Sequence, residues 1–362
     1  MKRYLITGGA GFIGSNFIRH LLKKDHDLEC IVNLDAITYA GSRENLKGLP
    51  DSEKHILVDG DICDQELVSG LLRQHELDTI VHFAAESHVD RSIHGPAAFV
   101  RTNIQGTFSL LEAARQVWQK ECQLDGDEVR FHHISTDEVF GSLETQAAAF
   151  TETTPYAPNS PYAASKAASD HLVRAYGHTY GLPISITNCS NNYGPYQFPE
   201  KLIPIILLKA LAGELLPIYG DGQQIRDWLY VEDHCQAILQ VLKQGEVGET
   251  YNVGGNNQLT NLDLVKTLCT ILNEQAVDSP YKPHENLIQF VADRPGHDRR
   301  YAMDITKIDR VLGWEPNENL LSGLTKTVRW YLQNQDWLQA IIAEKEFGTW
   351  LAINYENRGD EE

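Results

Sequence analysis

The sequence YLITGGAGFIGSNFIRHLL, at residues 4–22, decides the fold. An apolar run is followed by glycines at positions 8, 11 and 14 and then by a helical pattern. Glycines between a strand and a helix let the chain turn tightly and bring backbone N–H groups close to a pyrophosphate. Gly8, Gly11 and Gly14 are therefore predicted to bind a dinucleotide, although an ordinary strand-to-helix turn is the alternative for the glycines alone.

The alternation of strand and helix continues through the first half of the chain. Apolar runs at 4–7, 30–35, 56–61, 79–85, 130–136 and 184–190 alternate with helical patterns at 15–24, 64–75, 96–120 and 162–180. This alternation predicts the α/β class with a doubly wound parallel sheet of the Rossmann type, because parallel strands need helical crossovers.

The second half is less regular and predicts a smaller C-terminal lobe woven into the first. A helix is expected at 204–213 and an amphipathic helix at 229–243, and the apolar stretch 202–219 reads as a buried helix. The polar, proline-bearing stretch 141–161 is expected to be a loop or lid. We expect a nucleotide-binding domain at 1–190, with returning segments near 228–260, and a substrate lobe at 191–227 and 261–362.

Composition excludes several classes of protein. The chain has 362 residues, and 31 basic against 50 acidic residues leave a net charge of −19, which disfavours binding to nucleic acids and acidic membranes. The first apolar run is too short for a signal peptide, no membrane span is expected, and the fourteen histidines form no metal-binding motif. The cysteines lack disulfide or metal spacing, so we expect reduced thiols and a cytoplasmic protein: Cys30, Cys63, Cys122, Cys189, Cys235 and Cys269.

Asp35 indicates which dinucleotide would bind. It ends the second predicted strand, where a carboxylate pairs with ribose hydroxyls and repels a 2′-phosphate. The pattern favours NAD over NADP. For Asp35 alone, a turn or helix-capping role is the simpler interpretation.

Tyr162 and Lys166, in the segment YAASK, stand four residues apart and therefore share one face of a helix. A neighbouring ammonium group favours the phenolate, so we expect Lys166, together with the positive nicotinamide ring, to lower the pKa of Tyr162. Tyr162 would then act as the base for hydride transfer. An isolated pair of this spacing is more often a buried aromatic with a lysine beside it. The glycine loop and the segment STDE favour the catalytic interpretation.

The segment Ser135-Thr136-Asp137-Glu138 ends the fifth predicted strand, which places a hydroxyl and two acids at the cofactor crevice. Thr136 is expected to bind the substrate oxygen that is oxidised. The two acids are surplus to a simple dehydrogenase, and turn chemistry is the alternative for them. They suit a hexose oxidised at C4, because one carboxylate can remove the C5 proton while a protonated neighbour expels the C6 hydroxyl as water.

Motifs along nearly the whole chain resemble the extended short-chain dehydrogenase family, and in particular its nucleotide-sugar dehydratases. They are GGAGFIGSN, AAESHVDRS, STDEVFG, YAASKAASD, NNYGPYQFPEKLIP, YGDGQQIRDWLYVEDH and DRPGHDRRY. The resemblance implies dTDP-glucose as the substrate, NAD retained through each turnover, and a homodimer built on the helices at 96–120 and 162–180. It also implies that Asp137 is the proton donor to the C6 oxygen, Glu138 the C5 base and Tyr162 the C4 base.

The same resemblance implies two sets of binding residues. Besides the glycines, Tyr162 and Lys166, the NAD contacts are Phe12, Ile13, Asp35, Ala36, Ile37, Thr38, Asp61, Ile62, Phe83, Ala84, Ala85, Ser87, Thr102 and Asn192. The substrate contacts are Ser87, Thr136, Asn191, Lys201, Leu202, Pro217, Ile218, Tyr219, Arg226, Asn261, Asp293, Arg294, Pro295, Gly296 and His297. Lys201, Arg226, Arg294 and His297 are cationic or titratable groups that suit a diphosphate, although separately each reads as a surface residue.

Two other functions remain open. A UDP-hexose 4-epimerase or UDP-glucuronate decarboxylase resembles this chain in the glycine loop and in Tyr162 and Lys166, but neither chemistry needs adjacent acids. A non-catalytic NAD-binding regulator would be expected to lose Tyr162, Lys166 or the acids, and all are present.

Overall fold

The computed structural model describes residues 2–124, 126, 128–293 and 295–343. A seven-stranded sheet forms its centre, and every strand pairing in this sheet is parallel. In spatial order the strands are β10 (Thr250–Val253), β6 (Ile184–Cys189), β5 (Arg130–Thr136), β4 (Thr79–His82), β1 (Lys2–Thr7), β2 (Leu28–Asp35) and β3 (His55–Asp59). The predicted doubly wound parallel sheet is confirmed.

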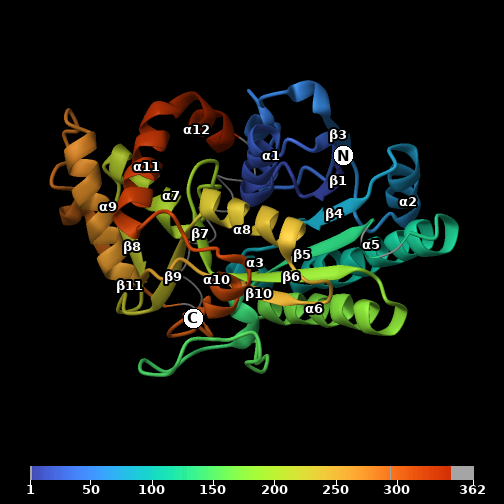
Figure 1. Ribbon diagram of the computed structural model, residues 1–362. Helices are drawn as coiled ribbons and strands as arrows, with labels where there is room; N and C mark the ends of the chain where they lie inside the picture. The colour runs from blue at the N-terminus through green and yellow to red at the C-terminus, as the bar shows by residue number, and fades with distance from the viewer. Residues whose placement is uncertain (1, 125, 127, 294, 344–362) are drawn as a thin grey trace.

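Helices cover both faces of this sheet, as Figure 1 shows. One face is covered by α1 (Phe12–Lys24) and α8 (Val231–Gln244), which bury side chains such as Phe17 and Ile238. The other face is covered by α2 (Gln65–Gln74), α6 (Pro161–Tyr180) and one long helix built from α4 (Pro96–Phe99), the π-helical turns Val100–Gly106, α5 (Thr107–Ala114) and the π-helical turns Arg115–Glu121.

The smaller lobe gathers on the left of Figure 1, around its own apolar core. Its sheets are β11 (Gln258–Thr260), β9 (Ile225–Tyr230) and β7 (Asn191–Tyr193), and β12 (Ile288–Val291) with β8 (Leu216–Tyr219). Its helices include α7 (Leu202–Ala212), α9 (Asn261–Gln275) and α11 (Leu320–Gln333). The remaining elements are α3 (Val89–His94), α10 (Thr306–Leu312), α12 (Gln335–Ile342) and the short 3₁₀ turns Arg43–Leu46, Ser52–Lys54, Asp137–Phe140 and His284–Leu287.

The two lobes are joined through the glycine loop. Trp337 of α12 donates a 2.8 Å hydrogen bond to the side chain of Asn45, and Asn45 in turn donates one of 2.8 Å to the carbonyl of Ala10. A residue near the end of the described chain therefore helps to hold the loop that begins the fold.

Two predicted helices are wrong in part. The stretch 202–219 is not one buried helix, because α7 ends at Gly213, whose φ of +72° turns the chain, and residues 216–219 form β8 beside β12. The helix predicted at 229–243 begins only at Val231, since Leu229 and Tyr230 end β9. Apolar content without a clear period does not distinguish a buried strand from a buried helix.

Among the described residues, none of the helices has the length and apolar character that a membrane span requires.

Candidate active site

The glycine loop is a cradle made almost entirely of backbone. Gly8 has a φ of +72°, and a Cβ atom there would lie 2.6 Å from the backbone nitrogen of Ala84. A Cβ atom on Gly14 would lie 2.3 Å from the carbonyl oxygen of Gly8. β1, β4 and the start of α1 therefore approach one another at distances that only glycine permits, and the N–H groups that begin α1 face the crevice.

Asp35 holds the next part of the crevice in place. Its two carboxylate oxygens accept hydrogen bonds of 2.8 Å from the backbone N–H groups of Ala10 and Ile37. Burial raises the pKa of this carboxyl group, and the two hydrogen bonds oppose that rise. Asp35 thus has the turn role that the sequence offered as the simpler interpretation, and it also faces the cavity.

The crevice opens into one cavity of about 690 Å³, a size that suits a cofactor or a drug-sized ligand. All five predicted catalytic residues line it: Thr136, Asp137, Glu138, Tyr162 and Lys166. The other predicted residues on its wall are Gly8, Gly11, Phe12, Ile13, Gly14, Asp35, Ala36, Thr38, Asp61, Ile62, Phe83, Ala84, Ala85, Ser87, Thr102, Asn191, Asn192, Lys201 and Leu202. Ile37 is not on the wall.

Several polar atoms of the wall are left for a ligand. Buried atoms without a hydrogen-bond partner among the described residues include Asp137 Oδ2, Ser190 Oγ, Asn191 Oδ1 and Trp228 Nε1. Because an unpaired buried polar group is costly, their position around one cavity fits a polar ligand such as a sugar or a ribose.

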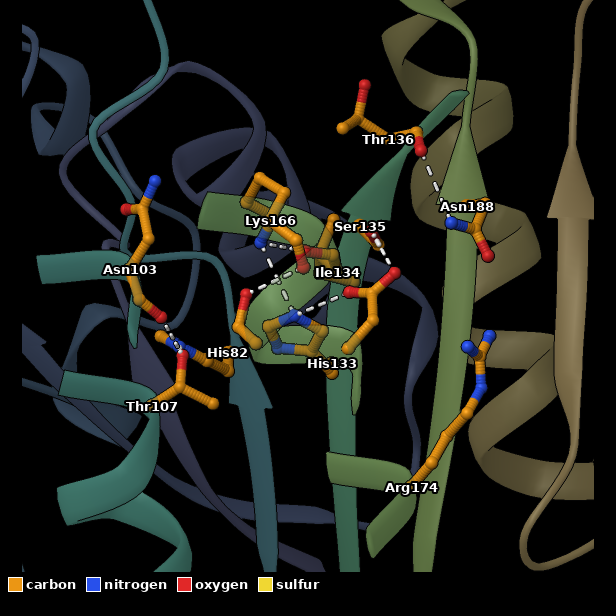
Figure 2. Close-up of polar contacts among 12 residues, drawn as sticks. His82, Asn103, Thr107, His133, Ile134, Ser135, Thr136, Lys166, Arg174 and Asn188 are labelled. Carbon is orange, nitrogen blue, oxygen red and sulfur yellow. Dashed lines mark hydrogen bonds and ion pairs between the residues drawn. The ribbon is translucent and has the colours of Figure 1, made fainter. Parts of the chain in front are cut away.

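Tyr162 and Lys166 lie on consecutive turns of α6, as predicted, but the pKa of Tyr162 is not lowered. Burial raises it well above its ordinary value, the charge of Glu138 raises it further, and a hydrogen bond with Thr136 opposes both. Lys166 Nζ instead donates a 2.7 Å hydrogen bond to the carbonyl of Ile134 (Figure 2). The expected lowering of the pKa also depends on the positive nicotinamide ring, so it stays a prediction for the cofactor-bound protein.

The acid pair follows β5 in the 3₁₀ turn Asp137–Phe140. Asp137 is almost completely buried, and this burial, with the charges of Glu138 and Asp227, raises its pKa well above the ordinary value. Glu138 is only half-buried, and its backbone N–H donates to the Thr136 hydroxyl over 3.3 Å. The two neighbours therefore have different surroundings, and Asp137 is the one that keeps its proton.

The remaining predicted substrate residues lie in the smaller lobe and are not on the wall of this cavity. They are Pro217, Ile218, Tyr219, Arg226, Asn261, Asp293, Pro295, Gly296 and His297, whereas Arg294 lies outside the described residues. Tyr219 is the last residue of the strand β8. Its hydroxyl is 3.5 Å from Asp90, and its ring meets that of His297 at a centroid distance of 6.4 Å.

The predicted cations also make contacts within the chain. Lys201 Nζ donates to the carbonyl of Ser87 over 3.0 Å, which links the smaller lobe to the loop after β4. Arg226 donates to the carbonyl of Asp298 over 2.9 Å and stacks on the ring of Tyr301.

Sequence reasoning missed several wall residues that follow the same rule as the predicted ones. Cys189 and Ser190 end β6 beside β5, so the rule that ligands bind at the carboxyl ends of strands identifies them. Glu200 and Phe198 belong to a quoted motif but carry no local signal of their own, because only the packing of the smaller lobe brings them to the wall.

Comparisons with known proteins agree with this geometry. A family model described as GDP-mannose 4,6 dehydratase matches residues 5–327. The chain is similar to a dTDP-glucose 4,6-dehydratase of Xanthomonas campestris pv. campestris strain B100, with 56% identity over 94% of this chain and 96% of the relative. It is also similar to dTDP-glucose 4,6-dehydratase 1 of Escherichia coli K12, with 54% identity over 98% and 99% of the two chains. A crystal structure of the dTDP-glucose 4,6-dehydratase DesIV from Streptomyces venezuelae with NAD bound has 46% identity and a TM-score of 0.84, and the match covers 94% of this chain and 99% of that one.

A first prediction concerns the cradle. Gly14→Ala is expected to lower the melting temperature and to reduce the further rise caused by NAD, because its Cβ atom would meet backbone at 2.3 Å. Gly70→Ala in α2 is the matched control, since its Cβ atom meets nothing within 4 Å and alanine favours a helix by about 0.5–1 kcal/mol. Thermal unfolding with and without NAD measures both effects. An unchanged NAD response in Gly14→Ala contradicts the prediction.

A second prediction concerns Asp137. Its folded-state pKa is raised, so its contribution to stability is fully present below the unfolded-state pKa and is lost as pH rises through the folded-state value. Asparagine does not titrate, so Asp137→Asn avoids this loss of stability with rising pH. The variant is therefore expected to be more stable than the wild type at neutral pH. Its advantage should shrink as the pH approaches about 4, the ordinary pKa of aspartate.

Melting temperatures of both proteins across this pH range test the sign. The exposed Asp51→Asn is the control for loss of a carboxylate that is already in water. A wild-type protein more stable than Asp137→Asn at neutral pH would show that Asp137 is not protonated by its surroundings.

Proposed function

The chain belongs to the GDP-mannose 4,6 dehydratase family, and from this premise we propose that it is a dTDP-glucose 4,6-dehydratase, an NAD-dependent lyase. It removes water from dTDP-glucose to form dTDP-4-keto-6-deoxyglucose. The observation that carries this conclusion is the position of Asp137 and Glu138 in the same cavity as Tyr162 and Lys166. The similar full-length relatives named dTDP-glucose 4,6-dehydratase support the nucleotide and the sugar.

The walls fit NAD. The glycine cradle at Gly8 and Gly14 leaves room for a pyrophosphate against backbone N–H groups, and Asp35 faces the cavity where a ribose follows. The carboxylate of Asp35 repels a 2′-phosphate, which favours NAD over NADP. When bound, NAD supplies the redox chemistry: it oxidises C4 and reduces C6 within one turnover.

Tyr162 takes the proton of the C4 hydroxyl group. Its phenol lies beside Thr136, whose hydroxyl can hold the same substrate oxygen. The raised pKa of Tyr162 in the ligand-free protein means that the phenolate forms only when positive charge is close by. Lys166, one helical turn away, and the nicotinamide ring provide this charge.

Glu138 and Asp137 then divide the elimination between them. The C4 ketone acidifies the C5 proton, and the half-buried Glu138 removes it as a carboxylate. Asp137, protonated because of its burial, gives its proton to the C6 hydroxyl, so that the C6–O bond breaks and water leaves. The proton that Glu138 has gained returns to C5 when C6 is reduced. Asp137 is then one proton short and Tyr162 holds the proton of the C4 hydroxyl, so transfer of one proton from Tyr162 to Asp137 by way of water resets both groups and balances the turnover.

The alternatives lack a use for these two acids. A 4-epimerase reverses one oxidation at C4, and a decarboxylase loses carbon dioxide, so neither has to expel a hydroxyl group from C6. A regulator without catalysis would leave the buried, protonated Asp137 unexplained, because a buried carboxyl group is costly to retain.

We propose that residues 191–227 and the described part of 261–362 hold the sugar nucleotide, while 1–190 with 228–260 hold NAD. Residues 344–362 of the expected lobe lie outside the described residues. Lys201 lies on the cavity wall and links the lobes. Tyr219, Arg226 and His297 would then hold the parts of the nucleotide that extend beyond this wall.

A homodimer is the proposed assembly. The apolar faces expected to form it are buried inside the chain: Phe99, Leu110, Leu111 and Ala114 on the long helix, and Ala167 and Val173 on α6. Other apolar side chains of the same helices are exposed, namely Val100 at 55%, Phe108 at 44% and Tyr180 at 46%. These side chains suit a second copy of the chain.

The free cysteines, including the exposed Cys122, further support the proposal of a cytoplasmic, reducing location.

The third prediction tests the function. Incubation with dTDP-glucose, without added cofactor, is expected to give a product lighter by one water molecule and no net NADH. Glu138→Gln should accumulate NADH absorbance without loss of water, because oxidation at C4 precedes removal of the C5 proton. Tyr162→Phe should form little NADH, since the C4 hydroxyl keeps its proton.

Product mass and absorbance decide between the alternatives. A product of unchanged mass with the galacto configuration identifies an epimerase, and no turnover of any hexose nucleotide favours the regulator. Dehydration at the wild-type rate by Glu138→Gln would remove Glu138 as the base.

The fourth prediction tests the assembly. The double variant Val100→Glu and Phe108→Glu is expected to be monomeric in light scattering at concentrations where the wild type is dimeric, because the new charges would be buried between copies. Leu321→Glu, at a 60% exposed leucine of α11, is the control and should remain a dimer. A monomeric wild type, or a dimeric double variant, contradicts the proposal.

A further inference from the structure

Lys166 is a buried cation that needs a counter-charge. The residue is 4% exposed, and its Nζ atom donates to the carbonyl of Ile134 over 2.7 Å and lies 3.4 Å from His133 Nε2 (Figure 2). Neither neighbour is an anion. Burial lowers the pKa of Lys166, so these two neighbours without a counter-charge favour the neutral amine. A neutral amine would not favour the phenolate of Tyr162.

Asp170 stands one helical turn beyond Lys166 on α6, and its side chain is completely buried. Its Oδ2 atom accepts hydrogen bonds from the hydroxyls of Ser135 and Tyr156, over 2.7 and 2.8 Å. Its Oδ1 atom lies 3.2 Å from His133 Nε2. Although burial opposes it, the pKa of Asp170 is lowered by His133, Lys166 and Ser135, so the group is a carboxylate.

The two histidines beside this pair are neutral. Burial and the charge of Lys166 lower the pKa of His133 to about 4, although Asp170 opposes them. His82 of β4 lies 5.2 Å from the His133 ring, and burial lowers its pKa well below the ordinary value. His133 therefore adds no charge of its own: its Nε2 atom lies near both groups and either donates to the Asp170 carboxylate or accepts from the Lys166 ammonium, never both at once.

The other groups packed around the pair add one further charge. Cys189 of β6 is neutral, since burial raises its pKa to about 12, and burial also raises the pKa of Tyr156 in the loop before α6. Arg174 is a cation on the next turn of α6 and donates to the hydroxyl of Tyr156 over 2.9 Å. Asp170 thus lies between two cations, and it does not line the cavity.

We propose that Asp170 is a positioning residue for the dehydration: its buried negative charge, one helical turn from Lys166 and next to the neutral His133 ring, keeps the Lys166 ammonium charged and fixed beside Tyr162. The inference rests on the proposed function only for its kinetic consequence. The charge state of Lys166 is a property of the ligand-free protein and is measured separately.

The test compares Asp170→Asn, which keeps the shape and removes the charge, with Tyr156→Phe, which removes one hydrogen bond to the carboxylate and leaves its charge. In Asp170→Asn the alkaline limb of the pH profile of kcat should move to lower pH by about one unit or more. At an alkaline pH on this limb, kcat should therefore be about tenfold lower than in the wild type. KM for dTDP-glucose should hardly change, because Asp170 does not face the cavity. Tyr156→Phe should keep the wild-type limb, and Asp170→Glu should restore it in part.

A second readout needs no substrate. The carbon-13 chemical shift of the Lys166 side chain in lysine-labelled, ligand-free protein, assigned with Lys166→Met, should titrate at lower pH in Asp170→Asn than in the wild type. If Asp170→Asn does not fold, Asp170→Ser removes the same charge with a smaller side chain and should shift the titration in the same direction.

The outcomes separate the two proposals. Equal Lys166 titrations in the wild type and in the folded variant overturn the role of Asp170, whatever the activity. A wild type that does not dehydrate dTDP-glucose overturns the proposed function, while the titration still decides the role of Asp170. A uniform loss of kcat at every pH, with an unchanged titration, means that Asp170 is merely structural.

Discussion

The close approach of Gly8 to the backbone of Ala84 is the constraint on which the site depends. It lies where β1 meets β4, the point at which the strand order of the sheet reverses. Crossovers on the two sides of this point lead to opposite faces of the sheet, so a crevice opens at the carboxyl ends of the strands. The ends of β5 and β6 bring the acid pair and Cys189 to the same crevice, because the strands are parallel and in register.

Burial then sorts chemically similar groups into different roles. Asp137 and Glu138 are neighbours in sequence and both line the cavity, yet Asp137 is almost completely buried, which raises its pKa, while Glu138 is only half-buried. Asp170 is equally enclosed but stays ionised, because hydroxyls, a histidine and a lysine surround its oxygens. The difference follows from what each carboxylate accepts: Asp137 has one hydroxyl donor, Thr136 at 3.2 Å, whereas Asp170 Oδ2 has two hydroxyl donors and Asp170 Oδ1 lies 3.2 Å from His133 Nε2.

Sequence reasoning succeeded where a signal is local and periodic. The strand 130–136 was predicted to the residue, and the helix 162–180 to within one residue of α6, because a strong pattern and a proline start signal mark them. It found the helix at 204–213 but failed where it extended one helix over 202–219, since a turn at Gly213 divides α7 from a strand that pairs with the distant β12. It could not give the pKa of Tyr162 in the ligand-free protein, because desolvation depends on what the rest of the chain packs around the phenol.

The amino-acid sequence by itself determined the parallel α/β fold, the glycine cradle, and the presence of Tyr162, Lys166 and two adjacent acids at the ends of a helix and a strand. These depend on spacing along the chain, which is a local property. Only the tertiary structure decided which acid has the raised pKa and which residues of the smaller lobe reach the cavity. It also decided that Asp170 and Lys166 both lie next to His133. Those outcomes depend on burial and on contacts between distant segments, because the energy of a charge is set by all the atoms that exclude water from it.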